Sequence, residues 1–98
     1  MTPNFRASTD FGGQSQILEL MWNVYLLKCC DGTIYTGCTN NIEERLKRHN
    51  KGEVKYTSTR LPLELVSYTA FVDKYKAYNF EKYLKSGSGK AFARKRLI

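Results

Sequence analysis

Two tyrosines, Tyr25 and Tyr35, stand ten residues apart on either side of the dipeptide Asp31-Gly32. The runs flanking this dipeptide are rich in β-branched and aromatic residues, and Asp-Gly between two such runs is a strong hairpin signal. We therefore expect the two phenol groups on neighbouring antiparallel strands. Whether they can act on one molecule depends on the face of the hairpin that each ring occupies, and the turn decides this.

Two turns fit the sequence between the strands. A two-residue turn would pair Cys30 with Thr33 and place the tyrosine rings on opposite faces. A three-residue loop ending in a left-handed Gly32 would pair Cys29 with Thr33 and bring both hydroxyls to one face. We favour this loop because it also gathers a largely apolar set on the other face, fit for a core: Trp22, Val24, Leu26, Ile34, Thr36 and Cys38.

In the favoured register Gly37 lies opposite Tyr25. A glycine beside a ring leaves open space, so we expect a substrate backbone to approach there. Gly37 is therefore a candidate substrate-binding residue.

Arg45 and His49 are spaced i and i+4 in a predicted helix from about Ile42 to Asn50. Side chains on consecutive turns could reach a common anion. The simpler interpretation is a solvated basic helix, since Lys47 and Arg48 lie in the same segment. Spacing alone favours that interpretation.

Glu81 falls in a second predicted helix, from about Lys74 to Lys85 with Asp73 as its N-cap. The buried side of this helix is predicted to be formed by Ala77, Phe80, Tyr83 and Leu84. A carboxylate at the edge of that side could hold a hard cation while remaining partly hydrated. By spacing alone, an ordinary ion pair with Lys85 is favoured.

The remaining elements add basic residues. We expect a polar loop over 51–62, in which Lys55, Tyr56 and Arg60 suit contact with a nucleic-acid backbone and a stacked base. A third strand is predicted over 63–71, with one face made of Leu63, Leu65, Ser67, Thr69 and Phe71.

Gly87 and Gly89 are expected to break the second helix before a short basic helix over 90–97. The inward side of this helix is predicted to be Ala91, Phe92 and Leu97. The GSGK sequence lacks the full phosphate-loop pattern. Exposed amides at Ser88 and Gly89, beside Lys90, could still bind a backbone phosphate.

Length and composition predict one small folded domain, because the chain has 98 residues, 42% of them hydrophobic. The net charge of +7 implies an anionic partner, nucleic acid first and an acidic membrane surface second, unless the charge serves solubility. No apolar run is long enough to span a membrane. We expect residues 1–20 to form a flexible arm or an extension, and 21–98 the folded domain.

Three cysteines, without features of a signal peptide in the first twenty residues, favour reduced thiols in the cytoplasm. A zinc site from Cys29, Cys30, Cys38 and His49 is conceivable. It is disfavoured because adjacent cysteines of a strand point to opposite faces.

From about Met21 to its end, the chain resembles the GIY-YIG nuclease family, particularly its small stand-alone bacterial members. The resemblance lies in Val24-Tyr25, in Tyr35-Thr36-Gly37, in Arg45 with His49, and in Glu81. The segments LKCCDGTIYTGCTNNIEERLKRHN and KYTSTRLPLELV are also similar to that subgroup. Asn23 and Thr36 depart from the two eponymous triplets.

The resemblance implies an α+β fold, with a small three-stranded antiparallel sheet flanked by two to three helices. It implies that a tyrosine like Tyr25 or Tyr35 activates or orients the attacking water, with His49 as a second candidate base. An arginine like Arg45 would contact the scissile phosphate. A glutamate like Glu81 would bind one divalent ion, Mg²⁺ or Mn²⁺.

The function expected from this resemblance is a metal-dependent endonuclease acting on DNA, in repair or in processing of branched or foreign DNA. The alternative is a nucleic-acid-binding module of the same fold with little or no cleavage. An adaptor that grips a partner protein through the basic terminal helix is the third hypothesis. We expect a monomer or a weak dimer.

Overall fold

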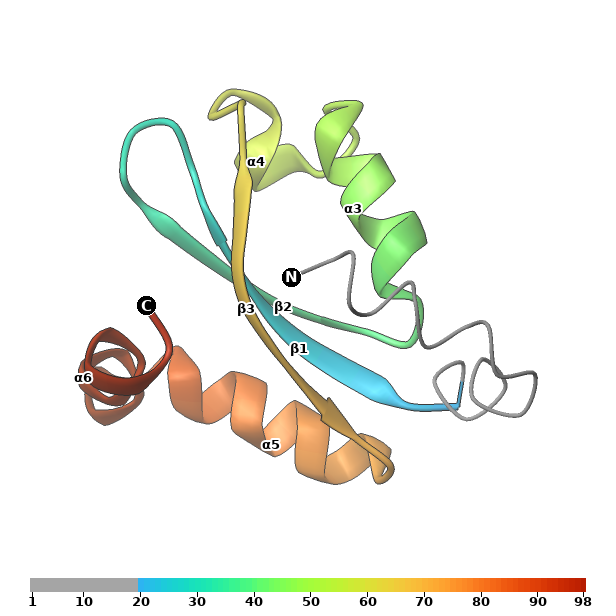
Figure 1. Cartoon of the computed structure of the whole chain (residues 1–98), viewed down its shortest axis with the longest axis vertical. Helices are drawn as coiled ribbons and strands as arrows, with labels where there is room; N and C mark the ends of the chain where they lie inside the picture. The colour runs from blue at the N-terminus through green and yellow to red at the C-terminus, as the bar shows by residue number, and fades with distance from the viewer. Residues whose placement is uncertain (1–19) are drawn as a thin grey trace.

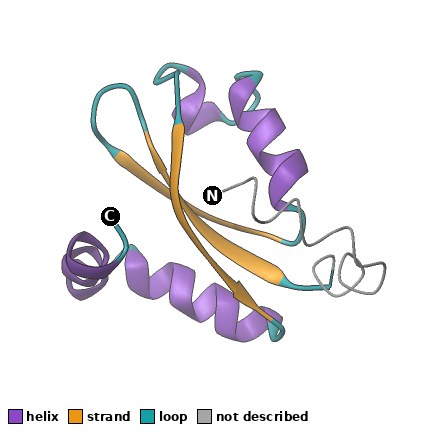
Figure 2. Ribbon diagram, viewed as in Figure 1, coloured by secondary structure: helices purple, strands orange, loops and turns teal. Residues whose placement is uncertain are grey.

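A three-stranded antiparallel sheet lies between two pairs of helices in the computed structural model, which describes residues 20–98 (Figures 1 and 2). The strands are β1 (Trp22–Lys28), β2 (Ile34–Thr39) and β3 (Glu64–Phe71), in the order β2-β1-β3. One face carries α3 (Ile42–Asn50) and α4 (Lys55–Ser58), and the other carries α5 (Lys74–Leu84) and α6 (Gly87–Arg96). The predicted α+β fold is confirmed, whereas the expectation of a flexible arm over 1–20 falls almost wholly outside the described residues.

The β1–β2 hairpin has the three-residue loop. The amide of Cys29 donates to the carbonyl of Thr33 at 2.8 Å, and Gly32 adopts a left-handed conformation with φ of 86°. Tyr25 therefore pairs with Gly37, and Tyr35 with Leu27. The register predicted from the sequence is confirmed, and both tyrosines lie on the face that packs against α3.

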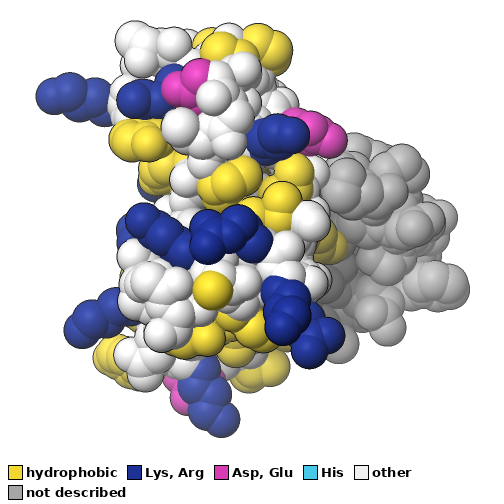
Figure 3. All heavy atoms as spheres, turned by 90° about the vertical axis from the view of Figure 1, so that its left-hand side faces the viewer, with side chains coloured by type: hydrophobic (Ala, Val, Ile, Leu, Met, Phe, Trp, Pro, Cys, Tyr) yellow, Lys and Arg dark blue, Asp and Glu magenta, His cyan; other side chains and the backbone are white. Residues whose placement is uncertain are grey.

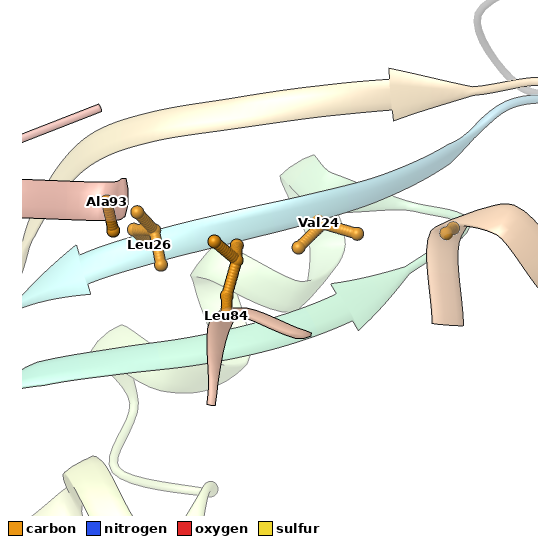
Figure 4. Close-up of a cluster of buried hydrophobic side chains, with 5 residues drawn as sticks. Val24, Leu26, Leu84 and Ala93 are labelled. Atoms are coloured by element: carbon orange, nitrogen blue, oxygen red, sulfur yellow. The ribbon is translucent and has the colours of Figure 1, made fainter. Parts of the chain in front are cut away.

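Each face of the sheet has its own apolar core. On the α5 side the buried residues are Val24, Leu26, Ala77, Leu84 and Ala93 (Figure 4). On the α3 side they are Tyr25, Leu27 and Ile42. Burial of an aliphatic side chain of this size stabilises a fold by roughly 1.5–3 kcal/mol relative to its exposed state. The central strand β1 is thus held from both sides, which fixes the position of Tyr25.

Strand β3 does not keep one alternating pattern. Leu26 pairs with Ser67 but Leu27 pairs with Leu65, so a bulge at Val66 shifts the register. Leu65 consequently packs on the α3 side while Val66 packs on the α5 side. The prediction that Leu63, Leu65, Ser67, Thr69 and Phe71 share one face is wrong, because a bulge cannot be deduced from alternation alone.

Helix α3 has the predicted bounds. The side chain of Asn41 caps it by accepting from the amide of Glu44 at 3.2 Å, and Gly52 beyond its end has a φ of 76°. The segment expected to be a polar loop contains the single-turn helix α4. Asn23 is buried in β1 between Thr39 and Ala70, so this departure from the family's triplet leaves the strand intact.

Two predictions about the second and terminal helices are wrong. The ring of Tyr83 is 41% exposed rather than buried, because the inward turns of α5 are already filled by Ala77 and Leu84. Gly87 and Gly89 lie inside α6, whose N-cap is Ser86. Gly89 packs so closely on α5 that a Cβ would collide with the backbone at Tyr83.

The inward face of α6 also differs from the prediction. Ala93 is buried, Leu97 packs against the same core as expected, and Ala91 and Phe92 are exposed. The amide of Gly89 is bound by the Ser86 side chain at 3.1 Å, so it is not free for a phosphate. None of the described helices is both long and apolar enough to cross a bilayer.

Candidate active site

A chain of three buried polar side chains links β1, α3 and α4. The hydroxyl of Tyr25 lies 2.9 Å from Nε2 of His49, and Nδ1 of His49 lies 2.7 Å from Oγ1 of Thr57. All three residues are fully buried. Burial of polar groups costs free energy unless they are hydrogen-bonded, and this chain satisfies both nitrogens of the imidazole.

The hydroxyl of Thr57 has a single proton, which it donates to the carbonyl of Val54 at 3.3 Å. We therefore assign the ring hydrogen of His49 to Nδ1, which donates to Thr57. Nε2 is then the acceptor for the Tyr25 hydroxyl. In this tautomer the imidazole is placed to take a proton from Tyr25.

Tyr35 and Arg45 complete the cluster on the α3 side. The Tyr35 ring centroid lies 5.0 Å from that of His49 and 6.2 Å from that of Tyr25. The guanidinium of Arg45 interacts with both tyrosine hydroxyls. Its Nε is buried and has no hydrogen-bond partner among the described residues. A buried, unpartnered donor of a cationic group is suited to an anionic oxygen.

The protonation states follow from burial and from Arg45. Burial raises the pKa of Tyr25 well above its ordinary value; Tyr35 adds to this effect, while Arg45 opposes it. Burial lowers the pKa of His49 to about 4, assisted by the positive charges of Arg45 and Arg48. Burial also opposes the charge on Arg45, but the two tyrosines outweigh it and the pKa of Arg45 is raised. At neutral pH Tyr25 is therefore a phenol, His49 a neutral imidazole and Arg45 a guanidinium.

Glu81 lies on the other side of edge strand β2. Its carboxylate accepts from Nζ of Lys85 at 3.0 Å, and its side chain is 21% exposed. It also contributes, after burial, to the raised pKa of Cys38, whose side chain packs on the α5 face. The structure thus brings together Tyr25, Tyr35, Arg45 and His49, but it leaves Glu81 on the opposite face of the sheet.

The Glu81 carboxylate could bind a divalent cation that retains most of its water ligands. Mg²⁺ is often bound through one or two carboxylates, with water and substrate phosphates as the other ligands. A partly exposed carboxylate at the sheet edge fits this pattern once it leaves Lys85. No three acidic, histidine or cysteine side chains of residues 20–98 converge on a possible metal site.

The candidate substrate-binding residues occupy different surroundings. The expectation of open space at Gly37 is wrong, because the Tyr25 ring fills that space and a Cβ on Gly37 would collide with it. Tyr56 is 45% exposed and its ring lies 5.7 Å from that of Tyr35. Arg60 stacks on Tyr56 and pairs with Asp31 at 3.2 Å. Lys55 is exposed at the start of α4, and Lys90 is exposed on α6.

Sequence reasoning missed Thr57. It stands between Tyr56 and Ser58 in a segment expected to be an exposed loop, and only the turn of α4 directs it inward. Thr57 could have been identified as a buried residue only if a single helical turn had been predicted directly after Val54.

The family model that matches this chain is described as the GIY-YIG catalytic domain and covers residues 21–96. The chain belongs to the GIY-YIG family. This is a family of nucleases, whose members generally use divalent metal ions. The match spans nearly all of the residues that the structure describes, 20–98.

Relatives of this GIY-YIG chain include proteins known as UPF0213. One from Clostridium perfringens is 49% identical over 63 residues, covering 63% of this chain and 68% of the relative. One from Bacillus licheniformis is 49% identical over 67 residues, covering 67% and 69%. The solution NMR structure of a UPF0213 protein from Bacillus halodurans is 37% identical with a TM-score of 0.51, covering 76% of this chain and 83% of that one.

Proposed function

We propose that the protein is a metal-dependent endonuclease that hydrolyses phosphodiester bonds in DNA. The observation that carries this proposal is the cluster of Tyr25, Tyr35, His49 and Arg45. It holds a neutral imidazole as proton acceptor next to a guanidinium whose buried Nε has no hydrogen-bond partner within residues 20–98. Hydrolysis of a phosphodiester needs a group that accepts a proton from water and a neighbouring cationic group that stabilises charge on the phosphate, and the imidazole and the guanidinium are suited to these two roles.

In this proposal the two tyrosines have different roles. Tyr25 is fully buried, whereas Tyr35 is half-buried and is the phenol accessible to a substrate. In the proposed path, water attacks phosphorus and passes a proton to the Tyr35 oxygen, while the Tyr35 proton moves to Tyr25. The Tyr25 proton then moves to Nε2 of His49. The P–O bond to the leaving group breaks, and solvent protonates the leaving oxygen.

Arg45 stabilises the negative charge that develops on the phosphoryl oxygens and on the tyrosines. Glu81 would hold the divalent ion, Mg²⁺ or Mn²⁺. When bound, such an ion supplies Lewis-acid stabilisation of the phosphate and the leaving group. Because Glu81 lies across β2 from the cluster, the scissile strand would pass over this sheet edge.

The test is nicking of supercoiled plasmid and branched DNA with and without Mg²⁺ or Mn²⁺. We expect Glu81→Ala to abolish cleavage with little effect on DNA binding, and Tyr35→Phe to slow cleavage strongly. Glu64→Ala is the matched control, since it removes an exposed carboxylate from the other edge strand, β3. Equal cleavage by Glu81→Ala and the wild type would remove the enzyme proposal.

The second candidate function is nucleic-acid binding with little cleavage. The separation of Glu81 from the cluster and its ion pair with Lys85 favour it. Binding without any metal-dependent nicking would establish this alternative. For either function we place the protein in the cytoplasm as a monomer or weak dimer, in repair or in processing of branched or foreign DNA.

A further inference from the structure

A half-open groove of about 670 Å³ lies along the edge of β2, between the hairpin and α6. Its floor is apolar and includes Leu26, Ile34 and Leu84. Tyr35 and Tyr56 line it from the side of the proposed active site. The groove therefore continues from the catalytic cluster around the sheet edge to the opposite face.

The charged side chains lining the groove are all cationic: Lys85, Lys90 and Arg94. Lys85 pairs with Glu81, whereas Lys90 and Arg94 make no ion pair with any residue in 20–98. On this side of the molecule, Lys and Arg side chains border hydrophobic ones across the middle of the face (Figure 3). An apolar floor with a cationic rim fits an anionic ligand that also has flat apolar surfaces.

Size restricts that ligand. Grooves of roughly 300–1,000 Å³ are typical of small-molecule sites, so this one has room for one or two nucleotides. A duplex keeps its bases stacked inside, and a base must leave the stack before it can enter such a site. Single strands bind where a positive groove follows the backbone and aromatic rings stack on the bases.

We propose that this groove binds unpaired nucleotides of the cleaved strand, next to the scissile phosphate. Lys90 and Arg94 hold the backbone, and the rings of Tyr35 and Tyr56 stack with bases over the apolar floor. The substrate class is therefore DNA with a single-stranded segment at the cleavage position. This inference rests on the proposed function for its orientation, since Tyr35 belongs to both sites.

The experiment measures binding of the full chain to a fluorescein-labelled oligothymidylate and to a blunt duplex of equal length, by fluorescence anisotropy in metal-free buffer. The test variant is the double change Lys90→Ala, Arg94→Ala. The matched control is Lys95→Ala, Arg96→Ala, which removes two exposed cations from the same helix but outside the groove. Circular dichroism verifies that each variant is folded; Lys90→Gln, Arg94→Gln replaces the alanine variant if that one unfolds.

We expect the wild type to prefer the single strand, and the groove variant to lose about tenfold or more in affinity for it. The control variant should lose about threefold or less, from the change in net charge alone. Equal losses in the two variants, or a duplex bound as tightly as the single strand, would overturn the inference.

Because the assay contains no metal, its result is independent of cleavage. If the wild type nicks plasmid DNA but fails this binding test, the proposed nuclease function is retained and the groove inference is rejected. If the protein binds as expected but never nicks DNA, the groove inference is retained and the nuclease function is rejected.

Discussion

At the scale of single residues, the buried chain from Tyr25 through His49 to Thr57 is the feature that ordinary packing does not explain. An apolar side chain at any of these positions would avoid the cost of burying a polar group. Each of these side chains instead relies on its neighbour for a hydrogen bond, because an unpaired polar group at this depth destabilises a fold by about 1–3 kcal/mol. Thr57 is the last member of this hydrogen-bonded series, and its bond to Nδ1 of His49 leaves Nε2 as the nitrogen that accepts from Tyr25.

Thr57→Val keeps the shape of the side chain but removes the hydroxyl. We expect the free energy of unfolding to fall by about 1–3 kcal/mol, because Nδ1 of His49 loses its partner, and cleavage to slow. Thr57→Ser should restore both. The ¹⁵N NMR shifts of the chain's one histidine report its tautomer directly. A valine variant with an unchanged tautomer and rate would show that Thr57 only fills space.

The lowered pKa of His49 predicts how stability depends on pH. Between about pH 6.5 and 4 the unfolded chain binds a proton at this residue and the folded chain does not, so stability falls as pH falls through this range. The slope reaches at most about 1.4 kcal/mol per pH unit. Urea unfolding from pH 7 to 4.5 measures it. His49→Gln should flatten this part of the curve, and an equally steep curve in that variant would assign the dependence to other groups.

At the scale of elements, the close pairing of β1 and β2 determines whether the tyrosines work together. Gly37 is required because the Tyr25 ring occupies the place of its missing Cβ. Gly37→Ala should therefore displace that ring, cost about 1–3 kcal/mol by overpacking and slow cleavage. Gly87→Ala is the control, because open space surrounds that helical position. It should leave stability unchanged or raise it by up to about 1 kcal/mol. Denaturant unfolding of both variants decides the matter, and equal stabilities would contradict the packing argument.

The sequence predicted the elements that follow local rules. Asp31-Gly32 and the apolar alternation gave the hairpin register, and Asn41 with Gly52 bounded α3. The bulge at Val66 and the inward turn of Thr57 were missed because tertiary packing, not local pattern, selects them. The position of Glu81 across β2 could not be predicted for a related reason: helical spacing places a residue on a face of its helix, but not relative to a distant strand.

At the scale of the whole molecule, positive charge is unevenly distributed. The chain has 16 Lys and Arg residues against 9 Asp and Glu residues. Helix α6 contains four of these cations, Lys90, Arg94, Lys95 and Arg96, and no acidic residue. It packs beside α5, the helix of Glu81, so the basic surface adjoins the proposed metal ligand and the groove. This arrangement would draw a polyanion towards the edge of β2.

Counterion release makes that attraction measurable. For single strands, the logarithm of the binding constant falls with the logarithm of salt concentration with a slope of about −0.7 for each phosphate neutralised. Contacts from Lys90 and Arg94 predict a slope of roughly −1.4 for oligothymidylate, and the change Lys90→Ala, Arg94→Ala should bring it close to zero. Anisotropy titrations across a range of KCl concentrations measure both slopes, and the Lys95→Ala, Arg96→Ala protein should keep the wild-type value. A complex insensitive to salt would point instead to a role for the basic helix in gripping a partner protein.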